Sequence, residues 1–140
     1  MSNINLGRAI LGGVVAGIVL NIGEFLLNDV IFGAQMKEFF QRFNLPEPGG
    51  SFLATATLLT LVLGIVIVWL YAAIRPRLGP GPKTAICAGL LMWFGVYLYS
   101  GVINGMIFQI PAKMLIIAVV WGAVEYVLAA IAGAWLYREA

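Results

Sequence analysis

Four long apolar segments constrain this chain more than any other feature of its sequence. They lie near residues 9–32, 52–74, 84–108 and 113–137. A helix of roughly 20 apolar residues crosses a hydrocarbon layer about 30 Å thick, and each segment is long enough to do so. Only 10% of the residues are charged, whereas soluble domains typically carry about 25%. We therefore predict an all-α integral membrane four-helix bundle, forming one transmembrane domain over residues 1–140.

The residue types that are scarce here argue against several classes of function. The chain has no histidine, and its single cysteine, Cys87, lies in an apolar run. Histidine is the commonest metal ligand and general base, so we expect no metal and no cofactor. The net charge of +2 comes with scattered basic residues, so nucleic acid is not an expected partner. No nucleophile–base pair or phosphate-binding loop is recognisable, and we expect no enzymatic activity.

The segment RPRLGPGPK, residues 75–83, predicts a stiff turn because its prolines and glycines oppose helix continuation. With four spans, both termini lie on the same side of the membrane as this turn. That side carries five basic residues: Arg8, Arg75, Arg77, Lys83 and Arg138. The other side carries three: Lys37, Arg42 and Lys113. The positive-inside rule therefore predicts that both termini are cytoplasmic.

A short amphipathic helix is expected between the first two spans, over residues 34–43, AQMKEFFQRF. Its apolar residues recur at helical spacing on one face: Met36, Phe39, Phe40 and Phe43. The opposite face is polar and carries Lys37, Gln41 and Arg42. This pattern predicts a helix that lies in the outer membrane interface as an anchor. A lid over an outer opening is the alternative role.

Each apolar segment also presents one face of small or polar residues. On the first, five such residues fall within an arc of about 80°: Gly13, Gly17, Asn21, Glu24 and Asn28. The other three segments carry, in chain order, Thr60 with Gly64, then Trp93, Tyr97, Ser100 and Asn104, and finally Gly122 with Glu125. Small residues let helices approach closely, and polar ones are tolerated where they face a neighbouring helix. These faces are expected to point inward, with Gly13, Gly17 and Gly122 at helix contacts.

The most polar residues of the four segments fall at a similar depth. At 1.5 Å per residue from the cytoplasmic basic residues, five of them lie about 20–24 Å deep: Asn21, Glu24, Thr60, Tyr97 and Glu125. No lysine or arginine is expected at that depth, so two ionised glutamates would be costly. Either both carboxyls are protonated, or they share one proton, or a bound cation neutralises them.

These residues define the candidate site for protons or a cation. Glu24 and Glu125 supply the charge, while neutral oxygens come from Asn21, Asn28, Thr60 and Ser100, with Tyr97 in the same layer. Trp93, Trp121 and Tyr126 are candidate pocket aromatics that would face an organic cation. A purely structural role for the layer, as hydrogen bonds that hold the helices in register, is the alternative.

The RPRLGPGPKTA turn and the WGAVEYVLA segment resemble those of uncharacterised small four-span membrane proteins of bacteria. The resemblance covers most of the chain; it implies a bacterial inner-membrane location and no particular activity. The position of Glu24 on the first of four helices also resembles the layout of small multidrug-resistance transporters. The chain departs from that layout in its second membrane carboxylate, Glu125, and in its longer spans, and it lacks their sequence motifs.

Two functions follow as hypotheses. The first is a small membrane protein whose buried polar layer binds or moves protons or a cationic species. The second is a non-enzymatic accessory or scaffold subunit of a larger membrane complex, in which the layer is structural. The expected surroundings are the lipid bilayer and either a second copy of the chain or a larger membrane complex.

Overall fold

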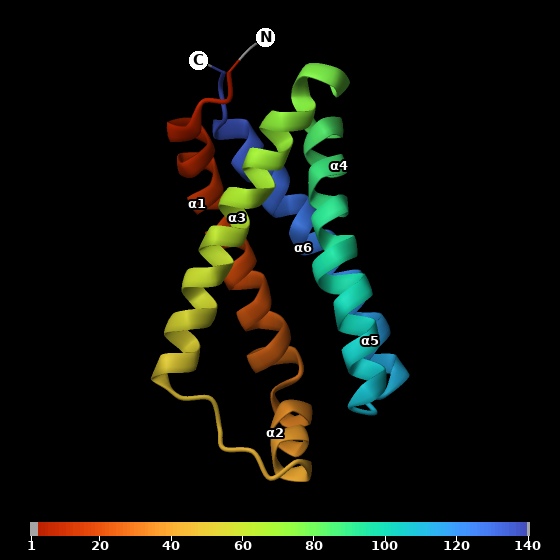
Figure 1. Cartoon of the computed structure of the whole chain (residues 1–140). Helices are drawn as coiled ribbons and strands as arrows, with labels where there is room; N and C mark the ends of the chain where they lie inside the picture. Colours follow the sequence, from red (N-terminus) through yellow and green to blue (C-terminus); the bar gives the residue numbers. More distant parts are fainter. Residues whose placement is uncertain (1–2, 140) are drawn as a thin grey trace.

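The computed structural model describes residues 3–139, and helices account for most of them (Figure 1). Four helical runs are long and apolar enough to cross a membrane: Leu6–Ile31, Gly50–Leu78, Pro82–Ile107 and Ala112–Leu136. Among residues 3–139 there is no β-strand. The prediction of an all-α chain with four long apolar helices is confirmed, and the chain has the character of a multi-pass membrane protein.

Two of the four runs contain a π-helical turn, and one short helix lies between the first two. The elements, in chain order, are α1 (Leu6–Phe25), η1 (Leu26–Ile31), α2 (Gly33–Arg42), α3 (Gly50–Leu78), α4 (Pro82–Trp93), η2 (Phe94–Tyr99), α5 (Ser100–Ile107) and α6 (Ala112–Leu136). The π-helices are η1 and η2, which continue α1 and α4 directly. The first run is therefore α1 with η1, and the third is α4, η2 and α5.

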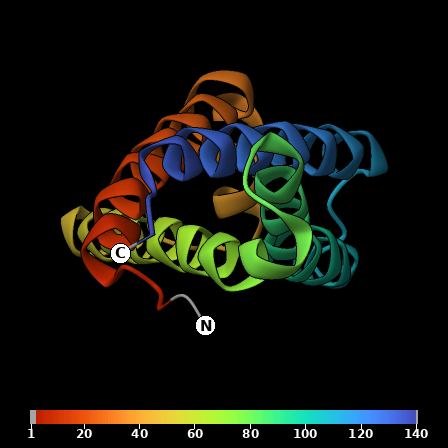
Figure 2. The same cartoon turned by 90° about the horizontal axis from the view of Figure 1, so that it is seen from above.

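The helices follow the order α1, α3, α4, α6 around the bundle. Both α1 and α4 pack against α3 and α6, and α1 and α4 lie across from each other (Figure 2). Each span thus contacts the span before it and the span after it, and the last returns to the first. This is the up-down-up-down arrangement that short connections favour.

The packed core occupies only the half of the bundle near the chain termini. Buried residues on α1 all precede Asn21, and those on α6 begin at Gly122. On α3 they run from Gly64 to Ala72. In the half next to α2, the part of the chain that the structure describes has only three buried residues: Leu27, Phe32 and Gly105. The helices are also more widely separated there (Figure 1).

Glycines let α1 and α3 approach backbone to backbone in the packed half. A Cβ atom on Gly64 would lie 2.6 Å from the Cα of Gly17, and it would also overlap the carbonyl oxygen of Gly13. A Cβ on Gly17 would in turn lie 2.7 Å from the Cα of Leu61. Real side chains do not approach so closely, so glycine is required at this crossing. The two small residues expected at a helix contact on α1, Gly13 and Gly17, both lie in it.

Two tyrosines close the end of the bundle that carries the termini. The backbone N–H of Asn5 donates to the Tyr137 hydroxyl at 3.1 Å, and that of Gly81 donates to the Tyr71 hydroxyl at 3.2 Å. The two rings meet edge to face, with centroids 6.0 Å apart. These contacts tie the start of α1, the α3–α4 turn and the end of α6 together.

The turn between α3 and α4 is shorter than the sequence predicts. The prediction that the helix ends before residue 75 is wrong, because α3 continues through Pro76 and ends at Leu78. Proline removes one backbone N–H hydrogen bond from a helix and clashes with the preceding turn. Pro76 is tolerated because the helix runs only two residues beyond it. An ion pair of 3.0 Å between Arg75 and Glu139 fixes this last turn, and the chain leaves the helix at Gly79, where φ is 84°.

Replacing Gly64 by alanine should separate α1 from α3. Overpacking of this kind typically costs about 1–3 kcal/mol in the free energy of unfolding. Gly101→Ala is the matched control, because within the described chain a Cβ there meets nothing within 4 Å. An exposed helical alanine is favoured over glycine by roughly 0.5–1 kcal/mol, so this control should not destabilise. The measurement is equilibrium unfolding in detergent micelles, and equal stability of the two variants would contradict the close crossing.

Candidate functional site

The Glu125 carboxyl is buried at the boundary between the packed half of the bundle and the open half. Glu125 lies on α6 and is only 5% exposed. Its side chain covers Gly23 of α1: a Cβ on Gly23 would lie 2.6 Å from the Glu125 Cγ. Both carboxyl oxygens are buried, and neither has a hydrogen-bond partner among residues 3–139. An ionised carboxylate without donors is the most costly state of such a group in an apolar interior.

Glu24, on α1, has the opposite surroundings. The Tyr97 hydroxyl donates to its Oε1 at 2.9 Å, and the Asn28 side-chain amide donates to its Oε2 at 3.0 Å. Each carboxyl oxygen of Glu24 therefore accepts one hydrogen bond. Hydrogen bonds to an ionised acceptor are about twice as strong as neutral ones, so this arrangement suits a carboxylate.

The two carboxyl groups are neighbours. Glu125 covers Gly23, the residue before Glu24, and the Tyr97 ring that donates to Glu24 packs on Gly122, one turn before Glu125. Neither glutamate forms an ion pair with any lysine or arginine of the described chain. A carboxylic acid that keeps its proton can donate one hydrogen bond, whereas a carboxylate only accepts. The pair thus combines one carboxyl that has two donors with one that has none.

Aromatic side chains hold the pair in place. The Trp121 indole N–H donates to the backbone oxygen of Gly23 at 3.1 Å, which fixes α6 against α1. The Tyr97 ring packs on Gly122, where a Cβ would lie 2.7 Å from its Cε1, and meets Tyr126 edge to face at 5.6 Å. Gly122 therefore lies at a helix contact, where its lack of a side chain leaves room for the Tyr97 ring.

Both π-helices lie at the Tyr97–Glu24 hydrogen bond. The first, η1, begins at Leu26, just beyond Glu24, and Tyr97 lies within the second, η2. π-Helical turns are rare and occur frequently at functional sites. They also carry more residues per turn than an α-helix, so they rotate the faces that follow them.

This rotation explains why Ser100 does not join the pair. A regular helix would place Ser100 and Asn104 on the face of Trp93 and Tyr97. Because η2 intervenes, both residues are exposed, and the Asn104 amide donates to the Ser100 carbonyl oxygen at 2.8 Å.

Three other predicted site residues make hydrogen bonds to the helix backbone instead. The Asn21 amide donates to the Gly17 oxygen at 3.0 Å and to the Thr57 oxygen at 3.4 Å. The Thr60 hydroxyl and the Trp93 indole N–H donate to backbone oxygens at 2.7 and 2.9 Å. The structure therefore brings together Glu24, Glu125, Asn28, Tyr97, Trp121 and Tyr126, and it leaves Asn21, Thr60, Trp93 and Ser100 outside.

Gly23 also belongs to the site, although the sequence pattern did not predict it. It accommodates the Glu125 side chain and accepts the Trp121 hydrogen bond. Its position next to Glu24 could have indicated this role, because a residue without a side chain beside a membrane carboxylate leaves room for a second group.

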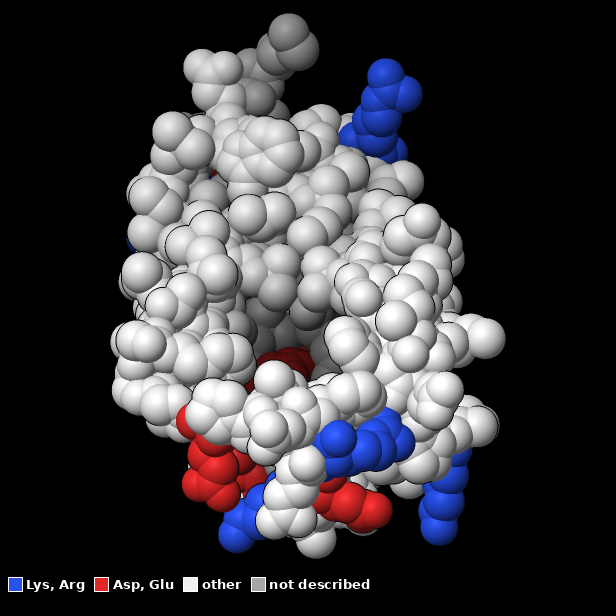
Figure 3. All heavy atoms as spheres, turned by 60° about the horizontal axis from the view of Figure 1, so that its bottom comes forward, with Lys and Arg blue, Asp and Glu red and all other residues white. Residues whose placement is uncertain are grey.

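A hollow opens in the surface at the α2 end of the molecule. Seen from that end, the surface is hollowed, and acidic atoms are visible at the bottom of the hollow (Figure 3). On the other side of the pair the fully buried Leu20 and Ala129 begin the packed core. Within residues 3–139, no three His, Cys, Asp or Glu side chains gather as metal ligands.

No protein-family model, curated protein or solved structure matches this chain. The chemistry of the site therefore rests on its geometry. A carboxylate with two donors beside a buried carboxyl without donors can hold one proton between them. The net charge of such a pair is a single negative charge, which a monovalent cation can neutralise.

Changing Gly23 to alanine should displace Glu125 and weaken the link between α1 and α6. The added methyl group would lie 2.7 Å from the Glu125 Cδ, so that side chain must move. We expect the Trp121 indole N–H to lose its Gly23 acceptor, which shifts its NMR resonance. Gly101→Ala, outside η2, is the control, since a Cβ there meets nothing within 4 Å in the described chain. An unshifted Trp121 resonance in the Gly23 variant would contradict the site geometry.

Proposed function

We propose that the Glu24–Glu125 pair binds one exchangeable proton within the membrane and that its remaining negative charge attracts a monovalent cation. The observation that carries the proposal is the buried Glu125 carboxyl, which has no donor among residues 3–139 and lies beside a Glu24 that has two. In this assignment Glu125 holds the proton and donates it toward Glu24, which is ionised. Tyr97 and Asn28 stabilise the remaining charge.

The charge balance favours this state over its alternatives. Two ionised carboxylates would repel each other in a medium of low dielectric constant, with no cationic side chain paired to either in the described chain. Two protonated carboxyls would leave the Tyr97 and Asn28 donors facing a neutral acid, where each hydrogen bond is weaker. One shared proton avoids the repulsion and uses both donors.

The same proposal places the chain in the bacterial inner membrane with both termini in the cytoplasm. The five basic residues expected on the terminal side, against three on the other, support this orientation. α2 then lies in the outer interface, and the hollow opens outward. The long apolar residues that are exposed on the spans, such as Ile18, Leu59 and Val120, face lipid.

Infrared spectroscopy of the protonated-carboxyl stretch tests the assignment. The native protein at neutral pH should show this band, Glu125→Gln should remove it, and Glu24→Gln should retain it, because Glu125 stays neutral there. The band should shift in D₂O, since the proton exchanges, and it should be lost as the pH rises and the proton leaves. Glu47→Gln, at an exposed position outside the spans, should leave the band unchanged.

Other outcomes are equally informative. A band removed by Glu24→Gln and kept in Glu125→Gln would reverse the assignment of the proton. A band that persists without deuterium exchange would make both carboxyls structural hydrogen-bond donors. The proton site would then be wrong, and the accessory-subunit hypothesis would take its place.

A further inference from the structure

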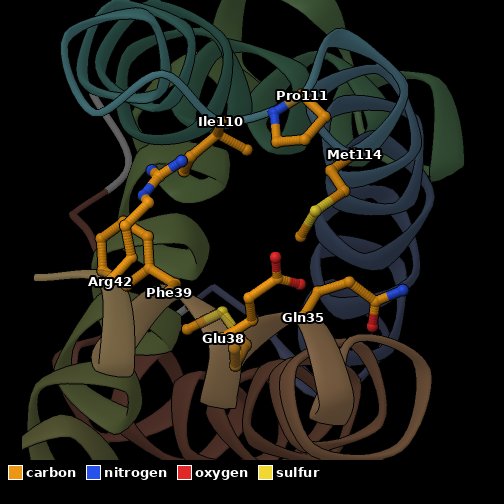
Figure 4. A pocket seen from close by; sticks show the side chains of 8 residues that line it. Gln35, Glu38, Phe39, Arg42, Ile110, Pro111 and Met114 are labelled. Atoms are coloured by element: carbon orange, nitrogen blue, oxygen red, sulfur yellow. The ribbon is translucent and has the colours of Figure 1, made fainter.

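A cavity of about 170 Å³ lies between α2 and the turn that joins α5 to α6. Its walls are mainly apolar: Met36 and Phe39 from α2, and Ile110, Pro111 and Met114 opposite. The Glu38 carboxyl points into the cavity, as Figure 4 shows. A carboxylate in an apolar opening raises the local concentration of cations.

Met114, which lines the cavity, lies on the same face of α6 as Glu125 of the carboxyl pair. Met114, Ala118, Trp121 and Glu125 follow one another at spacings of four, three and four residues, so they share one helix face. Met114 is about 16 Å from Glu125 along the helix axis. Met114, Ala118 and Trp121 are half-buried, and only Glu125 is fully buried. The fully buried end of this face is therefore the end at Glu125, and the residues between it and the cavity are partly accessible.

One arginine ties α2 across the opening. The Arg42 guanidinium donates a hydrogen bond to the Phe108 carbonyl oxygen, at the end of α5, and lies 4.7 Å from the centre of the Phe43 ring. Phe108 also meets Phe39 and Phe43 edge to face, at 5.9 and 5.7 Å. We refer to these four residues as the α2 latch. Arg42 is exposed, so water can replace its hydrogen bond to Phe108.

We propose that this cavity is the entrance through which water and small cations reach the Glu24–Glu125 pair, and that the α2 latch limits how far it opens. Glu38 is the acidic group at the entrance. The inference rests on the proposed exchangeable proton, and it adds the route by which that proton exchanges. Release of Arg42 lets α2 move away from the α5–α6 turn and widens the entrance.

Blocking the cavity tests the route. In a Cys87→Ser background, Met114→Cys is labelled with a bulky maleimide, and deuterium exchange of the Glu125 carboxyl band is followed by infrared spectroscopy. The label should slow exchange by roughly tenfold or more. Leu45→Cys with the same label is the control, because Leu45 is exposed at the same end but does not line the cavity. Exchange at the native rate in labelled Met114→Cys would overturn the proposal.

Releasing the latch should have the opposite effect. Arg42→Ala removes the tie to Phe108, so exchange of the same carboxyl band should be roughly threefold faster or more. Arg77→Ala removes an exposed arginine from the other end of the molecule and should leave the rate unchanged. Unchanged exchange in Arg42→Ala would remove the latch from the proposal.

The proton site and the entrance give different results when either one is absent. If Glu125→Gln does not remove a carboxyl band, there is no proton at this residue and the proposed function is wrong. If that band exists and exchanges, but neither the label nor the Arg42 variant changes its rate, the proton site stands and the entrance is wrong.

Discussion

Backbone contact between α1 and α3 determines how the rest of the molecule is arranged. The crossing of Gly13 and Gly17 over Gly64 leaves no room for side chains, so the two helices are closest in the half of the bundle near the termini. α6 joins them through Gly133, where a Cβ would lie 2.8 Å from the Gly12 oxygen. On α1 the run of buried small residues stops before Asn21. Beyond that point the helices separate, and the carboxyl pair occupies the boundary.

This boundary explains how a membrane protein accommodates two glutamates at one depth. Deeper in the packed half the pair would have no access to water, whereas in the open half it would not be held in a fixed geometry. At the boundary, Tyr97 and Asn28 supply donors to Glu24, and Gly23 leaves the space that Glu125 fills. Because Tyr97 belongs to η2 and η1 begins just after Glu24, both donors come from π-helical turns. The two hydrogen bonds that Glu24 accepts therefore depend on the conformation of those two turns.

The sequence predicted the helices well because hydropathy is a local property of each apolar segment. The similar level of Glu24, Glu125 and Tyr97 along the bundle could also be predicted, since rise per residue is nearly constant along a helix. The sequence placed Ser100 wrongly relative to Tyr97, because a π-helix breaks the 100° periodicity and carries no distinct hydrophobic pattern. Thr60 was expected to face the site, but a membrane hydroxyl can bond to its own helix, at Ala56. Such choices depend on the neighbouring helix, which periodicity does not specify.

Because one half of the bundle is packed and the other is open, proton binding and transport would place different demands on the structure. Binding from one side requires only the hollow at the α2 end, which already reaches the level of acidic side chains (Figure 3). Transport also requires passage through the other half, where Leu20 and Ala129 are fully buried. There the Tyr137 and Tyr71 hydroxyls accept hydrogen bonds from the backbone N–H groups of Asn5 and Gly81. Both tyrosine contacts are single hydrogen bonds to backbone N–H groups, each contributing about 1 kcal/mol net. The glycine crossing is the stronger barrier, because separating α1 from α3 forfeits many dispersion contacts at once. Opening of the terminal half would therefore have to preserve this crossing and move α4 and α6 away from it.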